Sequence, residues 1–536
     1  MGTTDTGRAS WRPVAWLTAR LVRRGTLAVA LGLGAYMVLE TFAFDVAYPD
    51  AASREALLTW GRDPGLRIIA GPATAVATVG GFAVWDAGIY LMLILGVWPL
   101  TTTSRVLRGD EDAGRSDMSL VGRIRPGHAL VVQLVVLLGA CVVIGAAIAL
   151  GLALTGAQAW GSVLFGAAMA GYAGALVGLA AVTSQVFPTR GRALAAAGAV
   201  LAALILLRMV SNSADSRTWL GWLTPYGWAD QLRAFGDNRW PVLFVPLAVT
   251  TALVAVAATL RQHRDSGAGL VGGGEARRST RWGLNGAGAF AWRANLGVVL
   301  GWCAGVAAAG LVVGVLLPTM DENLAADDGF RDVLAAMGMD AGDLARAFVG
   351  LWATILGLVI AVYAAFRMGA ARAEESSERA ELLLARPLRR WEWLGGHVLG
   401  LVVSVLLLCT VAAAALWLGG VATTASVTAA DAFSAMFNVL PVVAVFAGLA
   451  VLLFGVVPRL TVVGSATAAV AAYVLELVGP MLEWPDRIVG ISPFHHLETV
   501  PVDPVGWPAA FAMVGIGVAL AAAGVAAFQR RDLVGA

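Results

Sequence analysis

The chain has 536 residues, of which 59% are hydrophobic and 13% are charged, and its formal net charge is +2. A soluble domain carries about a quarter charged residues, so this composition excludes a soluble globular protein and favours one embedded in lipid. The nearly balanced charge gives no indication of a nucleic-acid partner.

Every one of the 37 basic side chains is an arginine, because the sequence contains no lysine. The phosphate-binding loop of P-loop ATPases places a lysine on the β- and γ-phosphates. We therefore expect no ATPase domain of that kind, and we do not expect the chain to be an enzyme by itself. Cys141, Cys303 and Cys409 lie in apolar stretches without metal-binding spacing, so no metal and no resident cofactor are expected.

Twelve apolar stretches are long enough to cross the hydrocarbon core of a bilayer. They are expected to be helices, because lipid leaves backbone groups no other partners and the stretches lack the alternation of barrel strands. The predicted spans of the first half are Thr26–Phe44, Gly81–Leu100, Ala129–Leu152, Trp160–Val186, Ala193–Val210 and Trp240–Leu260. Those of the second half are Leu296–Leu317, Ala347–Phe366, Leu394–Leu418, Phe437–Val457, Thr461–Val478 and Trp507–Phe528. The expected fold is an all-α polytopic membrane protein.

Arginine is unevenly distributed between the two sides of these spans. If the N-terminus lies inside, clusters such as Arg20, Arg23 and Arg24, and later Arg389 and Arg390, all fall on the inner side. The positive-inside rule then predicts a multi-pass protein of the cell membrane with both termini in the cytoplasm.

The two halves of the sequence match each other at several corresponding places. Arg115–Leu120 corresponds to Arg379–Leu384, and Thr224–Tyr226 corresponds to Ser492–Phe494. These matches, in the same order, predict an internal duplication, and six spans per half make it a parallel repeat. The predicted division is a first transmembrane half at 1–264, a cytoplasmic linker at 265–288 and a second transmembrane half at 289–536.

Each half carries a charged cytoplasmic segment between its second and third spans. Mixed charges at helical spacing favour short surface helices there. Because the segment occurs in both halves, we interpret it as a docking surface for a cytoplasmic partner; the alternative is a solvated loop that only sets topology. The candidate docking residues are Arg108, Asp110, Glu111, Arg115, Asp117, Glu374, Glu375, Glu378, Arg379 and Glu381.

Two further kinds of segment flank the spans. Val14–Arg24 mixes apolar and basic side chains and is predicted to be an amphipathic surface helix, with Ala289–Asn295 as a weaker counterpart. Ser211–Arg239 and Gly479–Gly506 precede the sixth span of each half and are aromatic and interrupted by proline. We expect them to be re-entrant outer segments built from short helices.

Charged residues inside spans are functional candidates, because charge is costly in lipid. Arg208 and Glu476 occupy nearly equivalent places in the two halves with opposite signs. They are predicted to form an ion pair at an outer gate; the alternative is that each reaches the outer interface separately. Asp86, with the aromatic residues Tyr226 and Phe494, is a candidate for the substrate pathway.

Several motifs point to a family. They are Gly80-Gly81-Phe82 with Trp85, Glu375 with Arg379–Leu384 and Arg386-Pro387, Trp391 with Trp393, and the paired proline–aromatic motifs before the sixth spans. Together they resemble the permease subunits of bacterial ABC exporters, most of all the duplicated twelve-span actinobacterial family linked to tetronasin and other polyketide antibiotics. The first half departs from the pattern, with Gly114 and Gly122 where the second has Glu378 and Arg386. Its docking segment is therefore expected to engage its partner differently.

The resemblance implies a coupling helix after the second span of each half and two copies of a separate cytoplasmic ATPase. ATP and magnesium would be bound by those partner subunits. The substrate would be a small hydrophobic or amphipathic compound, exported across the membrane, and membrane lipid would surround the spans. An ion-driven secondary transporter also fits two six-span halves, although mid-span carboxylates are scarce. A membrane scaffold or sensor subunit is a third possibility.

Overall fold

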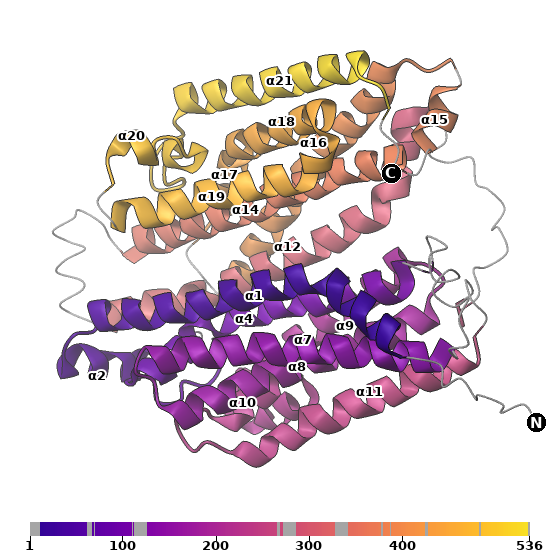
Figure 1. Ribbon diagram of the computed structural model, residues 1–536. Coiled ribbons are helices and arrows are strands. Elements are labelled where there is room, and N and C mark those ends of the chain that lie inside the picture. The colour runs from indigo at the N-terminus through magenta and orange to yellow at the C-terminus, as the bar shows by residue number, and fades with distance from the viewer. Residues whose placement is uncertain are drawn as a thin grey trace, which may run out of the picture. The chain divides into compact units, whose positions relative to one another are not determined.

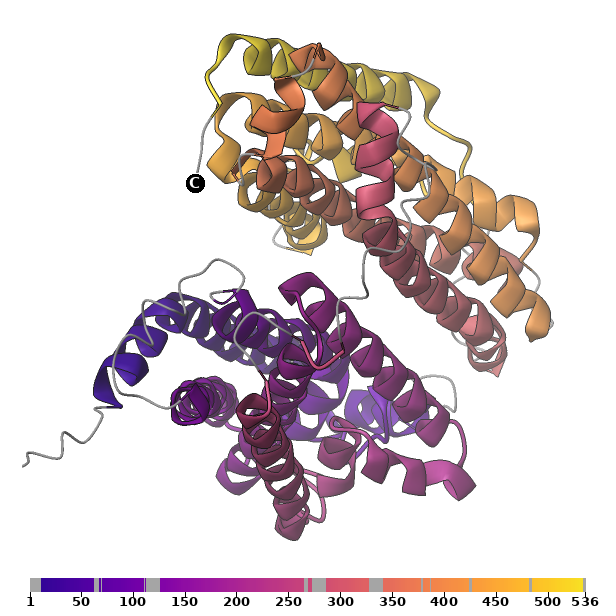
Figure 2. The same ribbon diagram turned by 90° about the vertical axis from the view of Figure 1, so that its right-hand side faces the viewer.

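The chain forms two helical units, and each is described here by itself. The computed structural model describes residues 11–61, 67, 68, 70–109, 111, 126–264, 269–271, 286–326, 341–376, 379–385, 387–423, 427–481 and 484–533. The first unit is Met1–Arg278 and the second is Ser279–Ala536. Figures 1 and 2 show both units as bundles of long helices.

The first unit contains five short or irregular elements besides its long helices. In chain order its elements are α1 (Arg12–Ala47), α2 (Ala51–Trp60), α4 (Val79–Ser104), η1 (Arg105–Gly109), α7 (Pro126–Leu154), α8 (Ala159–Val186), α9 (Arg190–Asn212), η2 (Asp215–Leu223), α10 (Gly227–Leu232), η3 (Trp240–Leu243) and α11 (Phe244–Gln262). Here η1 is a π-helical turn, and η2 and η3 are 3-10 helices.

The second unit has a similar order of elements. They are α12 (Ala287–Ala326), α14 (Ala341–Ser376), α15 (Arg379–Leu384), α16 (Arg390–Ala422), α17 (Ala429–Asn438), α18 (Leu440–Val456), η4 (Pro458–Leu460), α19 (Thr461–Met481), α20 (Asp486–Val489), η5 (Pro493–His496) and α21 (Trp507–Arg530). Within the described ranges every regular element of both units is helical.

Among the described residues, twelve helices are long and apolar enough to cross a membrane. Each overlaps one of the twelve stretches expected from hydropathy, so the predicted all-α polytopic fold is confirmed. The fourth span of the second half begins earlier than expected, because the short helix α17 runs almost directly into α18 and extends the span to Ala429–Val456.

The predicted N-terminal surface helix is not a separate element. Val14–Arg24 forms the first turns of the continuous helix α1, and Ala289–Asn295 likewise belongs to α12. No proline follows Pro13 before Pro49, so nothing removes a backbone hydrogen bond where the surface helix was expected to end. The amphipathic character is nevertheless present, since Trp16 is exposed while Val22 is buried.

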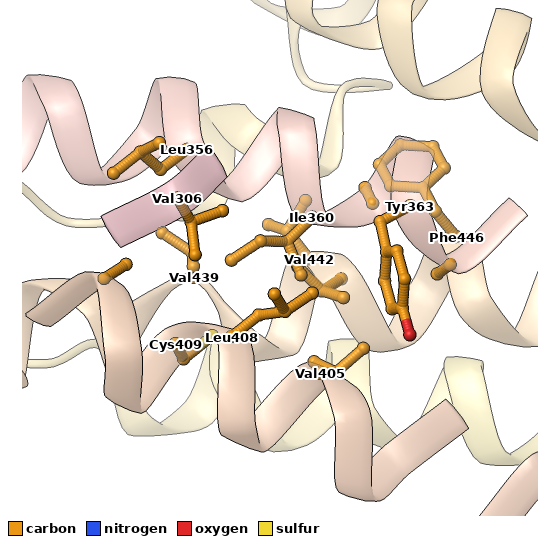
Figure 3. Close-up of a cluster of buried hydrophobic side chains, with 14 of the residues drawn as sticks. Val306, Leu356, Ile360, Tyr363, Val405, Leu408, Cys409, Val439, Val442 and Phe446 are labelled. Carbon is orange, nitrogen blue, oxygen red and sulfur yellow. The ribbon is translucent and has the colours of Figure 1, made fainter. Parts of the chain in front are cut away.

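Corresponding spans pack together in the two units. The first span packs along the third (α1 on α7, α12 on α16), and the fourth packs along the sixth (α8 on α11, α18 on α21). The second span contacts the fourth in both units (α4 on α8, α14 on α18). Figure 3 shows the core of the second unit, where Ile360 of α14, Leu408 of α16 and Val442 of α18 meet.

Close packing of α18 on α21 depends on two pairs of glycines. A Cβ atom built on Gly455 would lie 2.1 Å from the carbonyl oxygen of Gly524, and one on Gly448 would lie 2.2 Å from that of Gly517. Small residues let helix backbones approach closely, which is a common basis of helix association in membranes. The fourth and sixth spans of the second unit are therefore in direct backbone contact at these two places.

The segments before the sixth spans consist of short helices, as their proline and aromatic content predicts. In the first unit they are η2 and α10, and in the second they are α20 and η5. Figure 1 shows α20 at one end of the second unit and α15 at the other. Re-entry of these short helices into the membrane stays a prediction.

Candidate functional site

The end of the second span in the first unit holds a buried ion-pair network. Arg108, in the π-turn η1, is buried and donates hydrogen bonds to the carbonyl oxygen of Pro188 and, at 2.7 Å, to Glu111. Glu111 also lies 2.6 Å from Arg264, just beyond α11. The Glu111 side chain is only 5% exposed. Contrary to the expectation of a docking surface, Arg108 and Glu111 turn their charges into the unit.

The second unit has a corresponding network. Glu375, in the last turn of α14, accepts hydrogen bonds from both terminal nitrogens of Arg531 at 2.5 and 2.8 Å, and Arg372 lies 3.7 Å away. The Glu375 side chain is 1% exposed. It therefore belongs to the buried end of a span and not, as the sequence suggested, to an exposed docking helix.

The exposed part of the second cytoplasmic segment is the short helix α15. Ala380 is fully buried and anchors this helix, whereas Arg379, Glu381 and Leu382 are exposed. Glu374 is mostly buried instead, with its carboxylate 3.4 Å from Nε2 of His397. Among the predicted docking residues of this half that the structure describes, Arg379 and Glu381 are thus the two that lie on the surface.

Four other predicted docking residues cannot be placed. Asp110, Arg115, Asp117 and Glu378 lie outside the residues that the structure describes. Their proposed role therefore rests on the sequence repeat alone.

A second buried charge lies near the far end of α9. Arg208 donates hydrogen bonds to both carboxylate oxygens of Asp230, at 2.7 and 3.0 Å, and to the carbonyl oxygen of Ala70 at 3.1 Å. Its guanidinium also lies 4.7 Å from the centre of the Tyr226 ring. Gly71 makes room for this cluster, because a Cβ atom there would lie 2.5 Å from Nη2 of Arg208.

The corresponding charge of the second unit has its own partner. The carboxylate of Glu476, in α19, lies 3.2 Å from Nδ1 of His495, in η5. Both side chains are about one-third exposed, whereas Arg208 is almost completely buried. Arg208 and Glu476 are thus each paired within their own unit, which removes the electrostatic reason for the predicted ion pair between them.

The three pathway candidates occupy different environments. Tyr226 is buried against Tyr172, with ring centres 5.5 Å apart, and burial raises the pKa of its hydroxyl. Phe494 is buried against Tyr473 and Phe446. Both aromatic residues are therefore buried within their own units, and their role in a substrate pathway stays a prediction.

Asp86 differs from these two because it is exposed. It lies on α4, in the second span of the first unit. Tyr226 itself lines a small cavity, together with residues that include Trp85, Phe165 and Asp230. Of the three candidates, Asp86 is the one on the surface of its unit.

Sequence reasoning missed the partners that complete these clusters. Asp230 lies in the aromatic segment before the sixth span, where no spacing rule links it to Arg208. Arg264 and Arg531 follow the sixth spans at corresponding places, and that repetition was the one available signal. Pairing across a long sequence separation could only be seen in the folded units.

The twelve candidate spans found among the described residues, distributed over two units, define a multi-pass membrane protein. The model of a family described as "Multidrug efflux system permease Rv1217c, C-terminal domain" matches residues 12–260 and again residues 284–529. The chain belongs to this family of efflux permeases.

A relative in Mycobacterium tuberculosis (strain ATCC 25618 / H37Rv) also matches most of the chain. The multidrug efflux system permease protein Rv1217c of that organism is 33% identical over 515 residues, which cover 91% of this chain and 89% of the relative. The expected permease of an exporter is thereby confirmed. The narrower likeness to tetronasin-linked permeases stays a prediction.

Proposed function

We propose that this chain is the transmembrane permease of an ABC-type efflux pump that exports amphipathic or hydrophobic compounds. The observation that carries the proposal is the double match to a family of multidrug efflux permeases, one match for each half. The twelve candidate spans supply the membrane path that such a permease needs.

The energy source in this proposal is a separate ATPase. The chain has no lysine with which to build a P-loop. ATP and magnesium would therefore be bound by partner subunits, and two related halves favour two ATPase copies. ATP would drive export by binding more tightly to one conformational state of the complex than to the other.

Within the described residues of the second half, the helix α15 is the candidate for the docking surface. It follows the second span after only a few residues, and its exposed face combines Arg379, Glu381 and Leu382. Leu382 is 73% exposed. An apolar side chain flanked by charges is a suitable anchor for a protein partner, because buried apolar groups dominate binding energy at interfaces.

Orientation and location follow from the charge distribution. Arginine clusters at both ends of the chain and in the segments after the second spans favour the cytoplasmic side. In the proposed arrangement the protein lies in the cell membrane, with both termini and α15 facing the cytoplasmic ATPases.

Reconstitution tests this function against its alternatives. The permease is purified with any ATPase that accompanies it, placed in proteoliposomes and supplied with ethidium as an amphipathic probe. ATP-dependent movement of ethidium, absent from liposomes with the permease alone, is the expected result. Movement driven by an ion gradient without ATPase would instead identify a secondary transporter, and no movement under either condition would favour a scaffold or sensor.

A further inference from the structure

The two buried networks at the ends of the second spans share one design. In the first unit Glu111 is bound by Arg108 from its own segment and by Arg264 from the end of the sixth span. In the second unit Glu375 is approached by Arg372 from its own helix and bound by Arg531 from the end of the sixth span. In each unit a buried carboxylate thus connects the second span to the sixth.

The fourth span takes part in both networks as well. Arg108 donates to the carbonyl oxygen of Pro188, directly after α8, and Arg531 donates to that of Phe454, near the end of α18, at 3.2 Å. The Arg531 guanidinium also lies over the rings of Phe454 and Phe528, 5.3 and 5.1 Å from their centres. The ends of three spans are therefore held at one point in each unit.

A fourth element joins this point in the second unit. Arg390, the first residue of α16, donates a hydrogen bond of 2.6 Å to the carbonyl oxygen of Arg531. The docking candidate α15 lies in the chain between Glu375 and Arg390. Both ends of the α15 segment are therefore tied to the same residue, Arg531.

Burial makes these connections stiff. A carboxylate that faces a guanidinium through two hydrogen bonds has both a strong and a directional interaction. Separating the partners inside the unit would leave an uncompensated buried charge, which is strongly unfavourable. A displacement of the second span's end is therefore expected to move the end of the sixth span with it.

We propose that Glu111–Arg264 and Glu375–Arg531 are two latches that transmit motion of the ATPase-docking segments to the sixth spans, and through them to the fourth. The four residues act as positioning residues and do not contact the substrate. This inference rests on the proposed function, since a latch of this kind has a role only if an ATPase docks beside it.

The test compares two neighbouring arginines in the reconstituted permease–ATPase complex. Arg531→Gln removes the ion pair with Glu375. Arg530→Gln removes an exposed charge from the last residue of α21, directly before Arg531. Three quantities are measured for each variant: the ATPase retained on the purified permease, the rate of ATP hydrolysis, and the ethidium moved per ATP. The unfolding temperature in detergent shows whether the variant still folds.

We expect Arg531→Gln to lower the ethidium moved per ATP by about tenfold, within the range of coupling between distant sites. Bound ATPase and ATP hydrolysis should stay close to wild type, and Arg530→Gln should leave all three quantities unchanged. Glu375→Gln should behave like Arg531→Gln. The double variant should be no worse than either single variant, because all three remove the same interaction.

Two results would overturn the latch. One is an unchanged ratio of transport to hydrolysis in both Arg531→Gln and Glu375→Gln. The other is a parallel loss of folding, bound ATPase and transport, which would make the pair purely structural; the milder Arg531→Lys, which keeps the charge, should then lose the same quantities in proportion. Failure of the wild-type complex to use ATP would instead refute the proposed function itself.

Discussion

Residues at corresponding positions of the two halves have acquired different environments. Arg208 is buried in a cluster with Asp230 and Tyr226, whereas Glu476 meets His495 in a partly exposed pair. The cost of losing a partner depends on burial, because water compensates an exposed charge and cannot reach a buried one. Sequence position alone therefore does not reveal which of the two charges stabilises its unit.

Arg208→Ala is predicted to lower the free energy of unfolding by about 3 kcal/mol, because it leaves Asp230 buried without its partner. Glu476→Ala, the matched control, should cost less than about 1 kcal/mol. Unfolding in mixed detergent micelles measures both values. A double-mutant cycle should show coupling of Arg208 to Asp230 and none to Glu476; strong coupling to Glu476 would restore the outer-gate pair.

Gly71 provides a second prediction at this scale. Its φ angle of +94° is strained for other residues, and a Cβ atom there would also collide with Arg208. Gly156 has a similar φ of +88° with no atom within 4 Å, so Gly156→Ala isolates the backbone cost of about 1 kcal/mol. Gly71→Ala should destabilise clearly more in the same unfolding assay. Equal losses would show that the Arg208 cluster adjusts freely.

Among the helices, the pairing of the fourth with the sixth span is set by small residues. Hydropathy alone marks α18 and α21 as spans, yet it cannot state which helices touch. The glycine pairs at Gly448 with Gly517 and at Gly455 with Gly524 bring these two backbones into contact. Because lipid is as apolar as the helices, such close packing and not hydrophobicity selects neighbours within the membrane.

Gly524→Ala is predicted to destabilise the second unit by about 1 to 3 kcal/mol, since its Cβ atom would lie 2.4 Å from the carbonyl oxygen of Val451. Gly515 on the same helix has no atom within 4 Å of such a Cβ. Gly515→Ala should therefore be neutral. Thermal unfolding of the two variants in detergent compares them directly, and similar stability for both would contradict the packing described for α21.

The helix α15 carries the second prediction at this scale. Leu382→Ala should reduce the ATPase retained on the tagged permease by about tenfold, as expected for a central apolar anchor. Ile491, which is also 73% exposed but lies between α20 and η5, provides the control. Ile491→Ala should leave ATPase binding unchanged. Full retention by Leu382→Ala would place the docking contact elsewhere.

Considered as a whole molecule, the chain contains two permease units in one polypeptide. The same family model matches each half, and each half has its own hydrophobic core and its own charged network at the ends of the second spans. A single chain allows the halves to differ, as the Arg208 and Glu476 clusters already do.

Stoichiometry is the prediction that belongs to the whole molecule. Two docking segments in one chain should bind two ATPase subunits, so the intact complex should contain one permease and two ATPases. Native mass spectrometry of the purified complex measures this ratio directly. An equimolar complex, or one with two permease chains, would contradict the assignment of one docking surface to each half.

The sequence by itself determined the membrane class and the twelve spans. These conclusions depend on properties that are local or additive, such as the length and the hydrophobicity of an apolar stretch. The motifs around Trp85 and α15 also led to the correct family of permeases.

Only the tertiary structure decided which charges are paired and which are presented to partners. Glu111 and Glu375 were expected on a docking surface, yet the fold places each beside an arginine more than a hundred residues away. Helical spacing predicts contacts within a few residues, whereas burial and pairing depend on which span ends meet. Contacts between span ends depend on how the helix backbones pack in lipid. The charged networks that we propose to couple the docking segments to the spans are therefore visible only in the folded units.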